Sequence, residues 1–247
     1  MKIKQHLPSI FTLINLFLGF LAIINTMAGD YVIACYIILA AGAFDSVDGK
    51  IARLIGISTN FGKEIDSLAD MVSFCLAPSI LVYSLYTQNM PGISGELIAS
   101  APLIMGAIRL ARFNTDYASE NPEYFIGLPT PMNALSIASL VLFIEYFKID
   151  NPEYSQPRLL LPLILSLSYL MVSRVHYAKF PIINFNSGKQ NSLRLLGVAL
   201  FAVTFIGAIF IGYPYRVLAG FVSFYLLTGI WNHLKNLGNV ESKNQES

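Results

Sequence analysis

Four aspartates gather in one short stretch of an otherwise apolar chain, residues 45–70 (DSVDGKIARLIGISTNFGKEIDSLAD). Asp45 and Asp48 are three residues apart, and Asp66 and Asp70 are four apart. Both spacings place the two members of a pair on one face of a helix. A short glycine-containing segment that reverses the chain between the pairs would bring the two faces together. Four carboxylates would then converge on one small volume.

The charges of this stretch do not balance, because it holds five acids and three bases. The two excess negative charges would be neutralised by divalent cations. No Cys or His accompanies the acids, and ligation by oxygen alone is typical of Mg²⁺ or Mn²⁺ rather than zinc. The competing interpretation is a set of salt bridges between these acids and the neighbouring Lys50, Arg53 and Lys63. Four acids at these spacings, with glycines between them, favour a metal site.

The elements that must position the aspartates are membrane helices. The chain has 247 residues, of which 55% are hydrophobic and 13% charged, and its mean hydropathy is +0.58. That is about half the usual share of charged residues, too few to coat a soluble globule. Apolar runs of about 20 residues, long enough to cross a bilayer, recur along the chain. They predict an all-α transmembrane bundle with about eight spans, near Leu7–Ala28, Tyr31–Gly49, Gly62–Thr87, Glu96–Phe113, Thr130–Phe147, Arg158–Tyr177, Ser192–Gly212 and Arg216–His233.

The distribution of basic residues predicts how these spans are oriented. With the N-terminus inside, thirteen of the sixteen Lys and Arg residues fall on the cytosolic side. This bias follows the positive-inside rule, so both termini are expected in the cytosol. Residues 1–237 then form one membrane domain, and the polar segment 238–247 is expected to be a disordered cytosolic tail. A compact chain without a targeting extension is expected in a prokaryotic cytoplasmic membrane.

The aspartates are expected to lie within the membrane, where a charged group is costly. Asp45 is roughly 21 Å along its helix from Tyr31, and Asp70 is about 12 Å along a helix that starts at Gly62. Acidic groups in the membrane usually line a water-filled cavity or pair with another group. A divalent-cation or proton transporter is one alternative, but transport needs a path to the outer face. The predicted spans carry no matching acids in the outer leaflet.

The stretch resembles the signature of the CDP-alcohol phosphatidyltransferase family, with eight fixed residues over 26 positions. The resemblance implies a membrane enzyme that replaces CMP on a CDP-linked lipid with an alcohol. It implies two divalent metals over the diphosphate, a base that deprotonates the acceptor hydroxyl, and small residues near the cytidine. The residues implied for these roles are Asp45, Asp48 and Asp66 for the metals, Asp70 as shared ligand and base, Gly49, Ala52 and Gly62 near the cytidine, and Arg53 at a phosphate.

Further motifs resemble the phosphatidylserine synthase branch of the family. They are Leu7–Asn15, Asp66–Asp70 with Ser73-Phe74 and Ala77-Pro78, Arg109–Asn114, Gly127–Pro131 and Met171–Ser173. The resemblance implies CDP-diacylglycerol as donor and L-serine as acceptor. Another acceptor, such as glycerol 3-phosphate or inositol phosphate, and an ether-lipid donor stay open.

Arg109 and Arg112 bear on the identity of the acceptor. They are three residues apart at the cytosolic end of the fourth predicted span, on one helix face. Such a pair could hold the carboxylate of serine or the phosphates of the CDP-lipid. The alternative is that both arginines anchor the helix at the cytosolic interface.

The remaining residues add few further sites. The many aromatic residues are expected in the core, against lipid and at the interfaces, and not as a surface for nucleic acid. Cys35 and Cys75 lie in predicted spans and are expected to be buried, inert thiols. The partners expected for the chain are therefore CDP-diacylglycerol, L-serine and membrane lipids. The family resemblance also implies that the chain forms a homodimer.

Overall fold

We describe a computed structural model of the chain, which covers residues 10–55, 60–115, 124–151, 160–178 and 189–245. It is mostly helical, as the sequence predicts, with one small antiparallel pair of strands. The elements are α1 (Ile10–Met27), α2 (Tyr31–Ile55), α3 (Asn60–Asp70), η2 (Met71–Leu76), α4 (Ala77–Val82), η3 (Tyr83–Thr87), α5 (Ser94–Ala99), α6 (Ala101–Thr115), β1 (Tyr124–Ile126), α7 (Thr130–Asp150), α8 (Leu160–Val172), β2 (His176–Ala178), α9 (Lys189–Ile211) and α10 (Pro214–Gln245).

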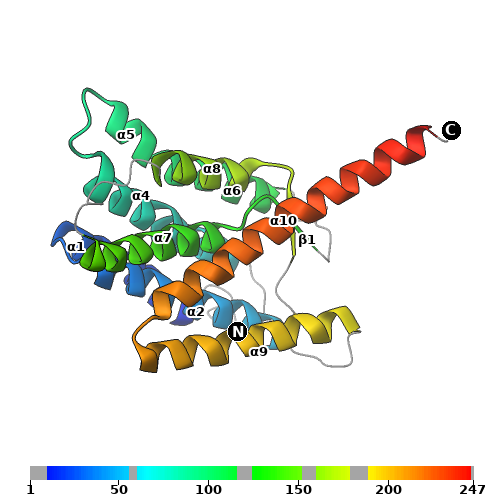
Figure 1. The fold of residues 1–247 in the computed structure, drawn as a ribbon, viewed down its shortest axis with the longest axis horizontal. Helices are drawn as coiled ribbons and strands as arrows, with labels where there is room; N and C mark the ends of the chain where they lie inside the picture. The colour runs from blue at the N-terminus through cyan, green and yellow to red at the C-terminus, as the bar shows by residue number, and fades with distance from the viewer. Residues whose placement is uncertain (1–9, 56–59, 116–123, 152–159, 179–188, 246–247) are drawn as a thin grey trace. The chain divides into compact units, whose positions relative to one another are not determined.

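The chain divides into two compact units. The first comprises residues 1–119 and 129–173, and the second comprises residues 120–128 and 174–247. In the first unit α2 packs against both α1 and α7, while α6 packs against α8 and η2 (Figure 1). In the second unit α9 and α10 form a hairpin, and α10 also packs against β2.

Each of the eight predicted spans overlaps a helical segment, and the first residues of two of them, 7–9 and 158–159, lie outside the described residues. Among the described residues, four helical stretches are long and apolar enough to cross a membrane: Ile10–Met27, Phe61–Thr87, Ser94–Thr115 and Thr130–Ile149. Three shorter apolar stretches accompany them, at Tyr31–Val47, Leu160–Val172 and Leu195–Ile211. The chain is therefore an integral-membrane helical protein, and four of the eight predicted spans contain a described stretch that is both long and apolar enough to cross a membrane.

The two faces of α1 show the burial pattern of a membrane helix. Its buried residues are small or polar and recur every three or four positions: Thr12, Asn15, Gly19, Ala22 and Thr26. Its exposed residues are large and apolar: Ile10, Leu13, Phe17, Phe20, Ile24 and Met27. Water would drive those large side chains inward, but lipid does not, so membrane helices pack through small residues and face the bilayer with bulky ones.

Gly19 marks a close approach between α1 and the helical stretch Phe61–Thr87, which follows α1 and α2 and is here called the third helical stretch. A Cβ placed on Gly19 would lie 2.7 Å from Cα of Ser73 and would overlap its Oγ. Ser73 lies in η2 and is fully buried. Only a residue without a side chain allows α1 to pack this closely against the backbone of η2.

We expect Gly19→Ala to destabilise the first unit by about 1–2 kcal/mol. Overpacking of this kind costs about 1–3 kcal/mol, and the better helix propensity of alanine returns up to about 1. The apparent midpoint of thermal unfolding in detergent measures the effect. Gly42→Ala is the matched control, because its Cβ would make ordinary contact with the Phe74 ring at 3.8 Å. An equal midpoint for the two variants would contradict the close approach.

The third helical stretch departs from α-helical geometry directly after Asp70. The segment η2 has π-helical hydrogen bonding, and the amide of Ala77 donates to the carbonyl oxygen of Val72, five residues earlier. Pro78 follows at once and has no amide hydrogen to donate. π-helical turns inside α-helices occur frequently at functional sites. Here the turn begins one residue beyond an aspartate that the sequence predicts to be catalytic.

The structure shows three features that the sequence did not indicate. The predicted span Arg158–Tyr177 contains a helix that ends at Val172, and His176–Tyr177 belong to β2. The strands β1 and β2 pair in a chain that was predicted to be all-α. The segment predicted as a polar tail is helical as far as Gln245, as a continuation of α10. Apolar periodicity marks the membrane-spanning part of an element, but it does not report a helix that continues as a polar segment.

Candidate active site

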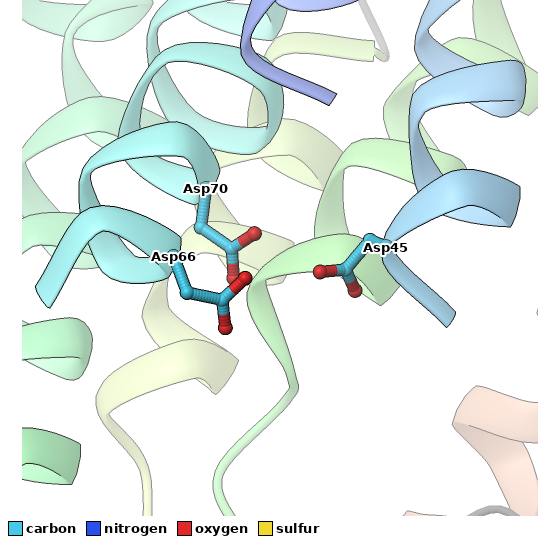
Figure 2. A group of neighbouring side chains, drawn as sticks. All are labelled: Asp45, Asp66 and Asp70. Carbon is cyan, nitrogen blue, oxygen red and sulfur yellow. The ribbon is translucent and has the colours of Figure 1, made fainter. Parts of the chain in front are cut away.

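Three of the four aspartates meet in the first unit. Figure 2 shows Asp66 and Asp70 on α3 and Asp45 on α2, with their carboxylates directed toward one another. One carboxylate oxygen from each side chain can be chosen so that all three lie within 4.8 Å of one another. All three side chains are half-buried. The predicted convergence of carboxylates from two helices is confirmed for these three.

The helical period and the packing of α1 together produce this geometry. Asp66 and Asp70 are four residues apart in α3, so they share a face. The helix α1 packs against α2, α3 and η2. Asn15 of α1 is fully buried, and its Nδ2 donates a hydrogen bond to Oδ1 of Asp70 at 3.4 Å. The first helix therefore reaches the carboxylate cluster directly.

Other predicted site residues lie partly or wholly outside the described part of the structure. The backbone of α2 is helical through the stretch that holds them, but the side chains of Asp48, Gly49, Ala52 and Arg53 are not described. Gly62 lies in the first turn of α3, two residues after that helix begins, and is half-buried. The roles predicted for these five residues stay predictions.

Arg109 and Arg112 contact the end of α8. Arg109 Nη1 donates to the carbonyl oxygen of Met171 at 3.3 Å, and Arg112 Nη1 donates to that of Val172 at 3.2 Å. The last carbonyls of a helix have no partner within the helix, and cations are favourable there. The two arginines thus cap α8, a structural role that the sequence did not indicate. Arg112 is exposed and Arg109 half-buried.

A polar network joins α6 to α3. Ser67 Oγ donates to Oδ1 of Asn114 at 3.1 Å, and Nδ2 of Asn114 donates to Oε2 of Glu64 at 3.4 Å. Ser67 directly follows Asp66, and Asn114 lies two residues after Arg112. The arginine-bearing end of α6 is therefore tied to the helix that carries two of the three carboxylates.

Two features of the structure were missed by sequence reasoning. The contact of Asn15 with Asp70 is the first of them; Asn15 ends the Leu7–Asn15 motif, and its role could have been found because it is the one amide on the small-residue face of an apolar helix. The pairing of His176 with His233, with ring centroids 5.7 Å apart in the second unit, had no signal in the sequence spacing. Burial, and then the charge of His233, lower the pKa of His176, which lies on β2 outside the candidate membrane-spanning helices.

Comparison with known proteins decides the family. The family described as CDP-alcohol phosphatidyltransferase matches residues 5–178, well over half of the chain. The chain belongs to the CDP-alcohol phosphatidyltransferase family. It is thus a member of a family of membrane phosphotransferases, and the family predicted from the aspartate signature is confirmed.

Relatives in several organisms match much of this phosphatidyltransferase. A CDP-diacylglycerol–serine O-phosphatidyltransferase of Helicobacter pylori is 34% identical over 227 residues, covering 90% of this chain and 89% of the relative. The Bacillus subtilis protein of the same name is 35% identical over 190 residues, covering 76% of this chain and 99% of the relative. An archaetidylserine synthase of Methanothermobacter thermautotrophicus is 33% identical over 177 residues, or 70% of each chain.

The carboxylates of this phosphatidyltransferase fit the metal ions that the family uses. Three carboxylate oxygens from Asp45, Asp66 and Asp70 form a donor set of hard oxygen ligands. No His or Cys belongs to the group found among the described residues. Such a set suits Mg²⁺ or Mn²⁺.

Proposed function

We propose that this protein transfers the phosphatidyl group of CDP-diacylglycerol to the hydroxyl of L-serine, giving phosphatidylserine and CMP. The observation that carries the proposal is the convergence of Asp45, Asp66 and Asp70 within 4.8 Å, inside the residues that match the family. The choice of serine is supported by relatives named CDP-diacylglycerol–serine O-phosphatidyltransferase, one of which is covered over 99% of its length.

The chemistry of the transfer assigns a role to Asp70. The serine hydroxyl oxygen attacks the phosphorus that carries the diacylglycerol, a new P–O bond forms, and the bond to the phosphate of CMP breaks. The proton of the hydroxyl passes to the carboxylate of Asp70, which acts as general base. Asp70 stands at the end of α3, where the helix changes to π-helical geometry, a feature that is frequent at functional sites.

The proposed metal ligands are the three converging aspartates together with Asp48. Asp48 follows Asp45 by three residues in α2, one turn along the helix. When bound, divalent ions neutralise the negative charge of the diphosphate and of the departing CMP. Gly49, Ala52 and Gly62 would leave room for the cytidine, and Arg53 would hold a phosphate oxygen.

The proposed topology places this chemistry at the cytosolic surface. Thirteen of the sixteen Lys and Arg residues lie on the side of the aspartates in the eight-span arrangement. That distribution supports cytosolic termini and an active site that faces the cytosol of a prokaryotic cell. Cytidine and serine would then enter from water while the acyl chains stay in the bilayer. We also propose a homodimer, and the family resemblance is its only support.

Release of CMP by purified protein in detergent tests the proposal. The protein is given CDP-diacylglycerol and Mn²⁺ or Mg²⁺ with serine, glycerol 3-phosphate or inositol phosphate. Release with serine alone is the expected result. Release with another acceptor would keep the family chemistry and overturn the serine assignment. Because one relative is named archaetidylserine synthase, an ether-linked CDP-lipid is the second donor to compare.

The arginine pair provides a further test of acceptor binding. We expect Arg112→Ala to raise the apparent KM for serine or for the CDP-lipid about tenfold, equivalent to about 1.4 kcal/mol. Arg216→Ala is the control, because Arg216 lies against the Tyr213 ring at 4.5 Å in the second unit. Unchanged KM values with a lower unfolding midpoint would contradict a role in binding. Arg112 would then act only structurally, through its hydrogen bond to the carbonyl of Val172.

A further inference from the structure

Asn15 is an unusual residue for its position. It is the sixth residue of α1, a helix whose sequence is otherwise almost entirely apolar, and its side chain is fully buried. Its Nδ2 donates to Asp70, but its Oδ1 has no hydrogen-bond partner among the described residues. A buried polar atom without a partner costs about 1–3 kcal/mol. An apolar side chain of the same size would avoid that cost, so packing alone does not account for an amide here.

The backbone of Asn15 also accepts a hydrogen bond from the third helical stretch. Ser73 Oγ donates a hydrogen bond of 2.8 Å to the carbonyl oxygen of Asn15, and both groups are buried. Ser73 follows Asp70 by three residues, so both contacts to Asn15 come from one face of the third helical stretch. Four residues further along α1, Gly19 lets the helix press against Ser73. Asn15 is thus fixed relative to Asp70 by two hydrogen bonds and one close backbone approach.

A hydrogen-bond donor at the position of Asn15 Nδ2 restricts the rotation of the Asp70 carboxylate. Asp70 shares its surroundings with the negative charges of Asp45 and Asp66, which repel it. Without a restraint the Asp70 side chain would turn away from the other two. A hydrogen bond from Nδ2 to one of its oxygens opposes that rotation and leaves the second oxygen for the reaction. Groups that orient metal-binding carboxylates in this way typically contribute 10- to 100-fold in metal affinity or activity.

We propose that Asn15 is the positioning residue of Asp70. It holds the carboxylate of Asp70 toward Asp45 and Asp66 without taking part in the reaction itself. The inference rests on the proposed phosphatidyl transfer for its catalytic consequence. The geometric claim about the carboxylate cluster stands on the contacts alone.

Asn15→Leu tests the proposal, because leucine has a similar size and removes both polar atoms. We expect kcat for CMP release to fall about 10- to 100-fold while the KM for the CDP-lipid and the unfolding midpoint change little. The matched control is Asn25→Leu in the same helix, since among the described residues Nδ2 of Asn25 donates to the carbonyl of Leu21 alone, 2.8 Å away. Its kcat is expected to equal that of the unchanged protein.

Binding of Mn²⁺ provides a readout that does not depend on turnover. The decrease of the free Mn²⁺ signal in electron paramagnetic resonance measures the affinity of each variant. We expect Asn15→Leu to raise the Kd for Mn²⁺ at least about tenfold relative to Asn25→Leu. If the unchanged protein released no CMP with serine, the proposed acceptor would fail while this titration still decided the role of Asn15. A kcat and a Kd equal to those of the control, or a loss that only follows the folded fraction, would overturn the inference.

Discussion

Replacing Asp70 with asparagine is expected to lower CMP release at least about 1,000-fold, while the Kd for CDP-diacylglycerol changes less than about threefold. Asparagine has the same shape as aspartate, but it cannot accept the proton of the acceptor hydroxyl. General-base catalysis is worth about 100- to 10,000-fold by itself, and Asp70 is also one of the three converging carboxylates. The loss should therefore appear in kcat.

The experiment compares initial rates of CMP release with equilibrium binding of the lipid to the same preparation. Asp30→Asn is the matched control, because Asp30 is an exposed acid in the turn between α1 and α2, outside the carboxylate cluster. Asp30→Asn is expected to retain full turnover. A rate above about one tenth of normal in Asp70→Asn would remove Asp70 as the base, since its contribution would then lie below that of general-base catalysis.

The second large effect concerns the metal ions. Treatment with EDTA is expected to reduce CMP release to below about 1% of its initial rate, and added Mg²⁺ or Mn²⁺ should restore it. Three carboxylate oxygens within 4.8 Å repel one another and the diphosphate of the donor. At such distances like charges interact by several kcal/mol at the low effective dielectric of a protein. Without cations the donor would be excluded from the site.

Single substitutions test the contribution of each aspartate to metal binding. Asp45→Asn and Asp66→Asn each remove one converging carboxylate, so each should require at least about ten times more Mn²⁺ for half-maximal activity. Glu145→Gln is the control, because the Glu145 carboxylate pairs with Lys148 at 2.6 Å on α7. Undiminished CMP release from protein shown to hold no metal after EDTA would contradict the proposed ligands.

Several properties of the protein follow from local patterns that a sequence displays directly. The eight helical segments lie where apolar runs predict them, since hydropathy and helical period involve only neighbouring residues. The same period places Asp66 and Asp70 on one face, and the lack of Cys and His near them indicates hard metal ions. The aspartate signature also identified the family, which the match over residues 5–178 confirms.

The exact lengths of elements were less predictable, because they depend on what each end packs against. The helix α8 stops at Val172, where Arg112 donates to the last carbonyl. The chain then pairs as β2 with β1, from a loop about fifty residues earlier. A strand of three residues is too short to produce a periodic pattern in the sequence. The π-helical turn after Asp70 was not predicted either, because a change from α-helical to π-helical hydrogen bonding leaves no periodic signal in the sequence.

Contacts between distant residues were decided by the tertiary structure alone. Asn15 and Asp70 are 55 residues apart, and their hydrogen bond exists because Gly19 lets α1 approach Ser73 closely. Sequence spacing gives the face of each helix, but it gives neither the distance nor the rotation at which two helices meet. Those are determined by the packing of small side chains at the contact. The sequence by itself thus determined the family, the membrane helices and the carboxylates, and the fold decided which residue holds Asp70 in place.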